Sequence, residues 1–272
     1  MKPVLTFFCF LLTFSVSAQT LKGSITDAKT GEALPYVNVG VIGKNIGTVS
    51  DDDGTFTLTI PAGHENDTAR VSMIGYKDME LTVAALHKHL LATPEIKMKP
   101  YTIEMEQVVI TNKKEKQKLL GNKTESKTIS AGFTSDKLGH EIGMVMKIKG
   151  APSLLKTFSA SIASEDNPPV KLRLNFYSVK DGQPHELIIN KNILVNVPKN
   201  ASLLVVDLTP YNIMVEDDFF VSLEWLEEAS KRIQFSAGLL AQPFFARQTS
   251  QGNWYKVSGV GIGFTVDTVY WK

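Results

Sequence analysis

Apolar and polar residues alternate at period two over much of the chain, as they do in half-buried β-strands. The alternation is strict over 56–60, where threonines separate large apolar residues, and over 171–177, where the apolar residues share one face. Only 84–91 has a helical spacing, and it is short. The pattern predicts strands over 21–26, 36–41, 48–49, 56–60, 71–74, 79–83 and 96–98, and then over 141–149, 155–162, 170–179, 187–197, 202–208, 219–226, 232–239, 253–257 and 261–269.

Short turn sequences separate the predicted strands of the second half. Gly, Asn, Asp and Pro mark turns at 181–182, 198–200 and 251–253, spaced as in a β-sandwich. Many short strands without helices between them indicate antiparallel sheets. The sequence therefore predicts an all-β protein, in which we expect residues 130–272 to form a jelly-roll-like antiparallel β-sandwich, the larger of two domains.

The sequence Asp51-Asp52-Asp53-Gly54 lies between two predicted strands and indicates a hairpin corner. Gly54 can adopt a positive φ without steric cost, and aspartates bond readily to nearby backbone amides. Carboxylates at alternate positions before a glycine also resemble a calcium loop, but this loop lacks a distal bidentate glutamate. We therefore interpret Asp51, Asp53 and Gly54 as a structural turn, and we predict no metal site.

Several short motifs follow one another between residues 21 and 98. They are Gly23-x-x-x-Asp27, Thr30-Gly31-Glu32-x-Leu34-Pro35-x-Val37-Asn38-Val39, Gly47-Thr48, Asp51-x-Asp53-Gly54-x-Phe56 and Val71-Ser72-x-Ile74-Gly75-Tyr76. Their combination resembles the carboxypeptidase regulatory-like domain. The resemblance implies a seven-stranded β-sandwich of prealbumin-like topology over 19–99, which acts as an accessory module without peptidase activity.

A lysine-rich stretch separates the two predicted domains. Before it, 103–111 is similar to the segment that follows this domain in TonB-dependent outer-membrane receptors, and we predict one short strand there. Those receptors continue into a plug and a long barrel, for which we expect this chain to be too short. Six lysines and few apolar residues over 112–127 predict a solvated segment. We assign 100–129 to a linker, with binding of an acidic glycan or lipid by the lysines as the alternative.

The start of the chain has the three parts of a secretory signal. Lys2 gives a positive n-region, 4–14 is largely apolar, and small residues lead to Ala18. We predict a signal peptide over 1–18 with cleavage after Ala18, and hence an exported protein, periplasmic or associated with the surface of a Gram-negative cell. Cys9 lies inside this segment without the flanking residues of a lipoprotein signal, so the mature chain has no thiol.

The charge balance gives no sign of a nucleic-acid or membrane partner. Without Lys2, 28 basic side chains balance 28 acidic ones. No overall field then attracts nucleic acid or an anionic surface. No later segment reaches the continuous apolar length of a membrane-spanning helix. We therefore expect no nucleic-acid partner and no transmembrane segment.

Catalytic motifs are weak in this sequence. The five histidines lack zinc-binding spacing, and we expect them on the surface. No G-x-S-x-G elbow occurs, and the glycines at 259–263 lead into a predicted strand rather than a helix, unlike a phosphate loop. Glu224 would need a second carboxylate across a cleft to act as a glycosidase, and we interpret it as an exposed charge. We predict no catalytic residue and no cofactor.

Aromatic residues of the second domain are the best candidates for binding. Trp254 and Tyr255 follow the polar turn at 251–253, where rings can stack on sugars, although core packing also accounts for such residues. Neighbouring strand positions face opposite ways, so we expect only one of the two rings to face a ligand. We predict a non-enzymatic accessory or binding protein of the bacterial cell envelope, with an envelope protein or a glycan as partner. A glycan- or peptide-acting hydrolase with its site in the second sandwich is the alternative, and the oligomeric state stays open.

Overall fold

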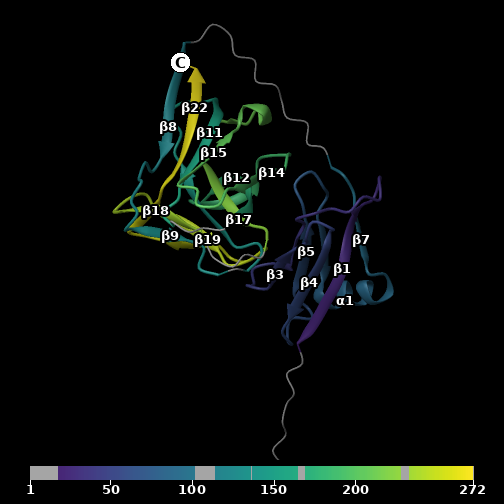
Figure 1. Cartoon of the computed structure of the whole chain (residues 1–272). Helices are drawn as coiled ribbons and strands as arrows, with labels where there is room; N and C mark the ends of the chain where they lie inside the picture. The colour runs from purple at the N-terminus through teal and green to yellow at the C-terminus, as the bar shows by residue number, and fades with distance from the viewer. Residues whose placement is uncertain (1–17, 102–113, 136, 165–168, 228–232, 272) are drawn as a thin grey trace, which may run out of the picture.

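Strands dominate the computed structural model, which describes residues 18–101, 114–135, 137–164, 169–227 and 233–271 (Figure 1). Among these residues, one α-helix and one short 3-10 helix interrupt a series of 22 strands. The prediction of an all-β protein is confirmed. Most of the predicted signal peptide, residues 1–17, and the predicted strand at 103–111 lie outside the described residues.

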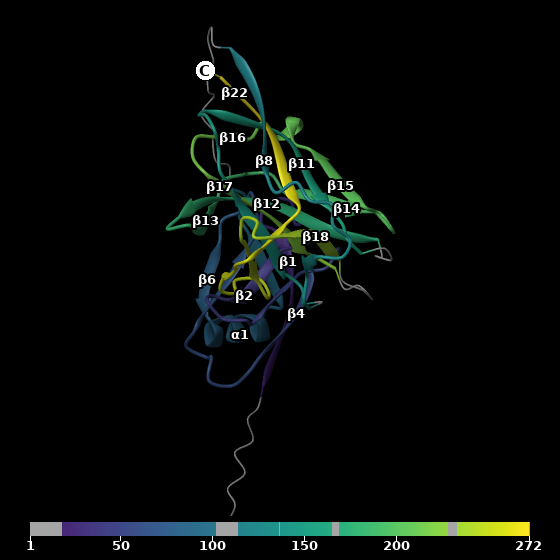
Figure 2. The same cartoon turned by 90° about the vertical axis from the view of Figure 1, so that its left-hand side faces the viewer.

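The chain forms two lobes, which lie side by side in Figure 1 and one above the other in Figure 2. The N-terminal lobe contains a three-stranded sheet of order β4-β1-β7 and a four-stranded sheet of order β3-β2-β5-β6. Neighbouring strands are antiparallel, except that β1 and β7 are parallel. The elements are β1 (Gln19–Asp27), β2 (Asn38–Val41), β3 (Gly47–Val49), β4 (Thr55–Ile60), β5 (Thr68–Ser72), β6 (Met79–Thr82), α1 (Val83–Ala92) and β7 (Glu95–Met98).

Alternate residues of these strands meet in one core. In β4 the three large apolar residues are buried and the threonines between them are exposed, as the pleat of a strand requires. The helix α1 begins after Thr82, whose hydroxyl accepts a hydrogen bond from the backbone N–H of Ala85 at 3.2 Å, an N-cap interaction. Leu86 and Leu90 of α1 pack into the same core, because residues four apart share one face of a helix.

The C-terminal lobe is a larger sandwich with a third, small sheet. One sheet has the order β13-β12-β17-β10-β19-β20 with β14 also paired to β12, a second has the order β15-β11-β22-β8 with β16 on β11, and the small sheet has the order β21-β18-β9. All of these strand pairs are antiparallel. The strands are β8 (Glu115–Gly121), β9 (Ser130–Gly132), β10 (Glu141–Met146), β11 (Ser153–Ser161), β12 (Val170–Lys180), β13 (Gln183–Leu187), β14 (Ile193–Val197), β15 (Leu203–Asp207), β16 (Met214–Val215), β17 (Phe219–Trp225), β18 (Gln234–Leu239), β19 (Phe244–Arg247), β20 (Tyr255–Val257), β21 (Val260–Ile262) and β22 (Phe264–Trp271).

Aromatic rings fill the space between the sheets of this lobe. Phe264 of β22 lies edge-on to Phe158 with ring centroids 5.2 Å apart, and edge-on to Phe235 at 4.8 Å, which is a favourable arrangement of aromatic pairs. Ile74 of the N-terminal lobe belongs to the same cluster of buried apolar residues. The larger core therefore extends across the boundary between the lobes.

Part of the expected linker is a strand. Residues 115–121 form β8, which pairs along its whole length with β22 at the edge of a sheet. Leu120 is buried, whereas Lys116 and Lys118 are exposed. Lysine is common on edge strands because its charge opposes pairing with a further strand. A lysine-rich edge strand therefore resembles a solvated linker in sequence, and the exact domain boundaries stay predictions.

The two lobes are joined by hydrogen bonds around the turn at 249–253. Ser250 Oγ donates to Asn38 Oδ1 at 2.6 Å, and Gln251 Nε2 donates to Ser72 Oγ at 2.9 Å. Backbone groups also pair, since the Gly43 N–H donates to the carbonyl of Gln251 at 2.9 Å. Ser250 and Asn38 are buried. The contact thus excludes water and fixes the lobes against each other.

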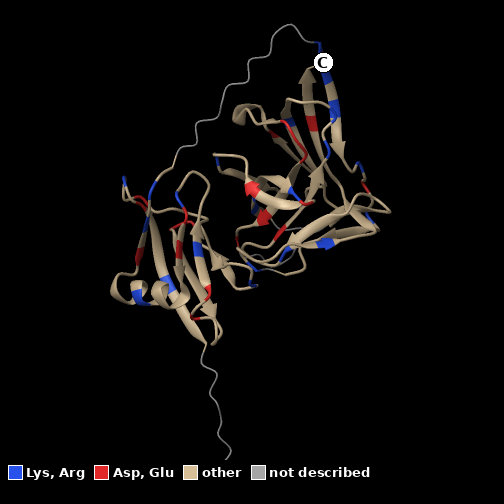
Figure 3. Ribbon diagram, turned by 180° about the vertical axis from the view of Figure 1, so that it is seen from behind, with Lys and Arg blue, Asp and Glu red and all other residues tan. Residues whose placement is uncertain are grey.

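Charges of both signs are interspersed over both lobes (Figure 3). This distribution agrees with the near-neutral net charge of +1 for the whole chain. No helix in the described part of the chain combines the length and hydrophobicity needed to cross a membrane.

Candidate functional site at the lobe interface

The sheet that contains β12 has two very different faces. One face of β12 carries Leu172, Leu174 and Phe176, which belong to the larger core. The other face carries Arg173 and Asn175, followed by Tyr177. This second face meets the N-terminal lobe, because a guanidinium Nη2 of Arg173 donates to the backbone carbonyl of Tyr36. Period-two alternation therefore points polar residues into the interface.

Strand register aligns four charged residues in a row across the sheet. Arg173 of β12 lies opposite Glu224 of β17, and Glu224 lies opposite Glu141 of β10. Glu141 in turn lies opposite Arg247 of β19. Directly opposite residues on antiparallel strands have Cβ atoms about 4.5–5.5 Å apart. The row thus has an arginine at each end and two adjacent glutamates between them.

Close polar contacts hold this charged row together. Arg247 reaches Glu141 Oε2 with Nη2 at 2.6 Å and with Nε at 2.8 Å. At the other end, Arg173 Nη1 lies 3.6 Å from Glu224 Oε2. Asn175 Nδ2 donates to Glu141 Oε1 and to Glu224 Oε2, both at 2.9 Å. The amide group therefore bridges two carboxylates that would otherwise repel each other.

The charged row is buried from water. Glu141 and Glu224 have no exposed surface, and Arg173 is 1% exposed. Burial raises the pKa of the Tyr177 hydroxyl well above its usual range, and the nearby Glu141 carboxylate raises it further. Burial by itself lowers the pKa of Arg247, but Glu141, Tyr177 and Glu224 together more than offset this and the net direction is upward. Both groups therefore keep their protons at neutral pH.

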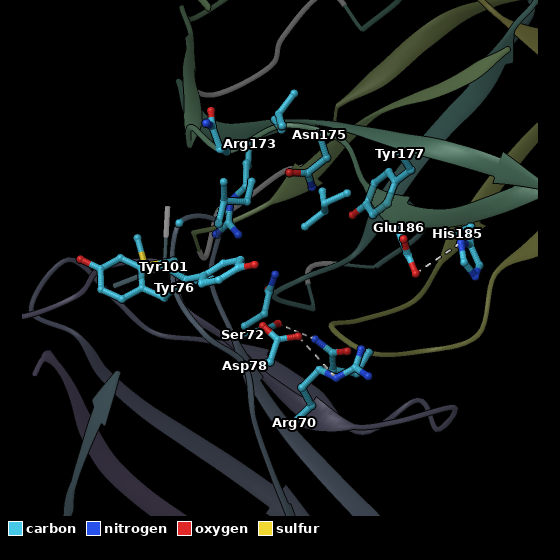
Figure 4. A pocket seen from close by; sticks show the side chains of 18 of the residues that line it. Arg70, Ser72, Tyr76, Asp78, Tyr101, Arg173, Asn175, Tyr177, His185 and Glu186 are labelled. Carbon is cyan, nitrogen blue, oxygen red and sulfur yellow. Dashed lines mark hydrogen bonds and ion pairs between the residues drawn. The ribbon is translucent and has the colours of Figure 1, made fainter. Parts of the chain in front are cut away.

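A cavity of about 320 Å³ lies between this sheet face and the N-terminal lobe. Figure 4 shows three side chains of β12 on one side of it and Arg70, Tyr76 and Asp78 on the other. Both lobes contribute to its lining, which consists of Asn38, Arg70, Ser72, Met73, Ile74, Gly75, Tyr76, Asp78, Tyr101, Arg173, Asn175, Tyr177, His185, Glu186, Leu187, Ile189, Asn190, Arg247, Gln251 and Trp254. Its volume falls at the lower end of the range of about 300–1,000 Å³ typical of small-molecule sites.

Two polar atoms of the cavity-lining residues on β12 have no hydrogen-bond partner in the described part of the chain. They are Nε of Arg173, a donor, and Oδ1 of Asn175, an acceptor. A buried polar group without a partner costs about 1–3 kcal/mol. Both atoms are buried, so a polar ligand in the adjacent cavity would satisfy them after a small movement of these side chains.

The comparisons with known proteins concern the N-terminal lobe. Residues 21–110 match the CarboxypepD_reg-like domain family. The expected resemblance is confirmed. The TonB-dependent receptor SusC of Bacteroides thetaiotaomicron is 46% identical over 66 residues, which are 24% of this chain and 6% of the receptor. The TonB-dependent receptor P3 of Formosa agariphila is 33% identical over 87 residues, 31% of this chain and 8% of the receptor. The chain thus spans less than a tenth of each of these relatives.

Trp254 and Tyr255 both follow the turn that contacts the CarboxypepD_reg-like domain, but their side chains have different surroundings. Trp254 lines the cavity and packs edge-on to Phe220 with centroids 5.0 Å apart. The guanidinium carbon of Arg247 lies 4.9 Å from the centre of the Trp254 ring, within range of a cation–π interaction. Tyr255 is 39% exposed and is not among the residues that line the cavity. The two neighbouring rings therefore differ in environment.

The turn at 51–54 belongs to the CarboxypepD_reg-like domain. Gly54 has φ of +73°, and a Cβ there would lie 2.7 Å from the carbonyl oxygen of Ile25. Asp51 Oδ1 accepts from the backbone N–H of Asp53 at 3.1 Å and of Thr55 at 2.8 Å. Among the described residues, no three His, Cys, Asp or Glu side chains gather as a metal site.

A second group of polar contacts lies at the rim of the interface. Lys171 Nζ lies 2.7 Å from Glu227 Oε1 and 3.3 Å from Asp52 Oδ1, and it also contacts the hydroxyl of Tyr36. Glu227, with help from Tyr36, raises the pKa of Lys171. Burial and the hydrogen bond with Asp52 raise the pKa of Tyr36 to about 12. Charges from both lobes therefore meet at this rim.

Two expectations about charged residues are wrong. Glu224 is fully buried rather than exposed, because the CarboxypepD_reg-like domain covers its side of the sheet. His140 is buried as well, with Nδ1 3.0 Å from Ser135 Oγ and its ring edge-on to Phe133. Sequence reasoning missed the rest of the charged row and Asn175. The alternation over 171–177 was the available signal, since one face is apolar and the other carries Arg and Asn.

Proposed function

We propose that this chain is a non-enzymatic binding protein of the Gram-negative cell envelope and that its ligand occupies the cavity between the lobes. The observation that carries the proposal is the composition of the cavity wall. Both lobes contribute polar and aromatic side chains to it, and Arg173 and Asn175 offer polar atoms without partners. A concave site with a few convergent polar groups is the usual form of a ligand site.

The envelope location draws on two independent signals. Both relatives that resemble the N-terminal lobe are TonB-dependent receptors, and the start of the chain has the features of a secretory signal. In this proposal the CarboxypepD_reg-like domain is a mount for the second lobe. It also supplies one wall of the binding cavity, through residues such as Ser72 and Tyr76.

A hydrolase is the second candidate, because Glu141 and Glu224 are adjacent carboxylates. Retaining glycosidases use two carboxylates about 5–5.5 Å apart. However, neither glutamate is among the described residues that line the cavity. Both oxygens of Glu141 accept hydrogen bonds, from Asn175 and from Arg247. This arrangement favours a structural role for the pair and a binding role for the cavity.

A cavity-filling substitution tests the proposed site. Leu187 lines the cavity at 41% exposure, so Leu187→Trp adds bulk to the cavity wall at a tolerant position. Leu194 has a matched exposure of 42% on β14 and does not line the cavity, so Leu194→Trp is the control. Retention of purified envelope polysaccharides and of a glycan array on the immobilised full chain is the measurement. We expect the first variant to lose retention and the second to keep it.

The same samples discriminate between the two candidates. Under the binding proposal, retained material stays intact during prolonged incubation with the unmodified chain and with Glu224→Gln alike. Release of shortened fragments that stops in Glu224→Gln would establish the hydrolase. Equal retention by both tryptophan variants would remove the cavity from consideration.

A further inference from the structure

We infer that the ligand of this cavity is a neutral polyhydroxylated molecule, a carbohydrate of one or two rings, and that Arg173 and Asn175 bind one of its hydroxyl groups or a neighbouring pair. The inference rests on the proposed function, since it assigns the chemistry of the same cavity. Three features of the lining carry it: compensated arginines, an unpaired donor beside an unpaired acceptor, and aromatic walls.

Every arginine of the lining already has a carboxylate partner. Arg70 Nη2 lies 2.6 Å from Glu80 Oε1, and Arg70 Nε lies 3.8 Å from Asp78. The other two arginines pair with the two glutamates of the buried row. Asp78 and Glu186 add further negative charge to the lining. An anionic ligand would therefore find no unpaired arginine, and would be repelled by the carboxylates.

The unpaired atoms specify both halves of a hydrogen-bonding group. Arg173 Nε–H needs an acceptor, and Asn175 Oδ1 needs a donor. A carboxylate or phosphate only accepts and would leave Asn175 unsatisfied, whereas an ammonium group only donates and would leave Arg173 unsatisfied. A hydroxyl group both donates and accepts. Arg173 and Asn175 are two positions apart on one strand face, so a vicinal diol can address them together.

Aromatic residues line the remaining walls. Trp254 and Tyr177 lie on the side of the C-terminal lobe, and Tyr76 and Tyr101 on the side of the N-terminal lobe. Figure 4 shows Tyr76 and Tyr101 next to each other, below the Arg173 side chain. Aromatic side chains present an apolar body together with a polar handle, which suits the mixed C–H and O–H surface of a sugar. The volume of about 320 Å³ limits the ligand to a small molecule or the end of a chain.

Titration of the full chain with defined probes tests this inference. The probes are neutral mono- and disaccharides, the matching uronic acids and sugar phosphates, and short uncharged peptides, with isothermal titration calorimetry as the readout. We expect at least one neutral sugar to bind and the charged analogues to bind more weakly. Arg173→Lys keeps a positive charge near Glu224 but lacks the Nε–H donor, so it should weaken sugar binding about tenfold or more.

Two further variants separate a loss of sugar binding from a loss of folding. Lys171→Arg lies on the same strand face two residues earlier and does not line the cavity, so it should leave sugar affinity within about twofold. Tyr101 lines the cavity and is 57% exposed, so Tyr101→Ala should weaken sugar binding without lowering the melting temperature. A sugar affinity that none of the cavity variants changes would overturn the assignment.

The outcomes also separate this inference from the proposed function. If no neutral sugar binds, or if uronic acids, phosphates or peptides bind more tightly, the carbohydrate assignment is wrong. The proposed cavity nevertheless stands in that case, provided that Leu187→Trp abolishes binding of the ligand that does bind. If a neutral sugar binds and Leu187→Trp leaves its affinity unchanged, both the inference and the proposed function fail.

Discussion

The two faces of the β12 sheet are built by the same strands yet are stabilised in opposite ways. On one face, Leu174 and Leu223 pack into the apolar core, where burial of apolar area is the main stabilising force. On the other face, Arg173, Glu224 and Asn175 are equally buried. There, charge pairing must offset the free-energy cost of removing ions from water. A difference of one position along the strand thus separates two kinds of core.

This difference shows what a buried charged row can and cannot contribute. A buried ion pair is often no more stabilising than an apolar pair of the same volume, but removing one partner is strongly destabilising. The polar face therefore adds little to stability compared with an apolar face, and it makes the contact with the N-terminal lobe specific. It also leaves polar atoms beside a cavity, which an apolar face cannot do.

Removal of one charge from the row should have the largest effect. Arg247→Met leaves Glu141 buried without its closest cation, so we expect a loss of about 3–5 kcal/mol in the free energy of unfolding. Leu223→Ala on the apolar face should cost about 2–5 kcal/mol. Chemical denaturation of the full chain followed by fluorescence measures both.

The double variant Glu141→Gln with Arg247→Met sharpens this comparison. It removes both charges of the pair, so it should be more stable than Arg247→Met alone. No corresponding rescue is expected from a second truncation next to Leu223. A double variant as unstable as the sum of the two single changes would show that the charges act independently.

A substitution that disturbs the close approach of the two lobes should have the next largest effect on stability. A Cβ at Gly47 would collide with the carbonyl group of Ser250 and approach Thr249 Oγ1 at 3.1 Å. Gly47→Ala should therefore destabilise the lobe contact by about 1–3 kcal/mol, with faster hydrogen exchange over 249–253. Gly238→Ala is the control, since its nearest atom outside the neighbouring residues would be 3.6 Å away. Unchanged exchange at 249–253 in Gly47→Ala would contradict a tight lobe contact.

Trp254 lies between Arg247 of the polar face and the proposed ligand site. Trp254→Phe keeps an aromatic ring against Phe220 but reduces the surface offered to the cavity, so ligand affinity should fall by on the order of 1 kcal/mol, or roughly fivefold. Tyr255→Ala removes the neighbouring exposed ring and should leave affinity unchanged. The reverse order of effects would place the ligand on the outer side of this strand.

The smallest effect is expected at the rim, where Lys171 pairs with Glu227 and Asp52. The pKa of Tyr36 is raised to about 12 and that of Lys171 is raised as well. A group whose pKa is higher in the folded state stabilises the fold below its unfolded pKa and loses this contribution as pH rises through the folded value. Stability should therefore fall from about pH 10 upward.

Lys171→Met tests this alkaline transition. Its side chain is 25% exposed, so solvent screening limits its contribution to about 1 kcal/mol or less at neutral pH. The part of the stability loss above pH 10 that belongs to this cation should disappear in the variant. An alkaline profile identical to that of the unmodified chain would show that the rim contacts do not contribute.

Local pattern was sufficient for most strands and insufficient for the site. The alternation over 56–60 and 171–177 gave both strands and their apolar faces correctly. β8 was missed because its lysines are those of a solvated segment, and β19 because Phe244-Phe245-Ala246 has no alternation. Trp254 was predicted as a binding residue because it follows the polar turn at 251–253. The row that includes Arg173 and Glu224 depends on the register between strands far apart in sequence, which no local pattern specifies.

The pairing of β8 with β22 has a mechanical consequence. Glu115 lies opposite Trp271, at the same end of the antiparallel pair. A tensile force applied to these two residues therefore acts on one end of the ladder, and hydrogen bonds perpendicular to the strands then break one after another. Under tension β8 should peel from Glu115 toward Gly121 at low force, exposing the edge of β22 while the remaining strands of the lobe stay folded.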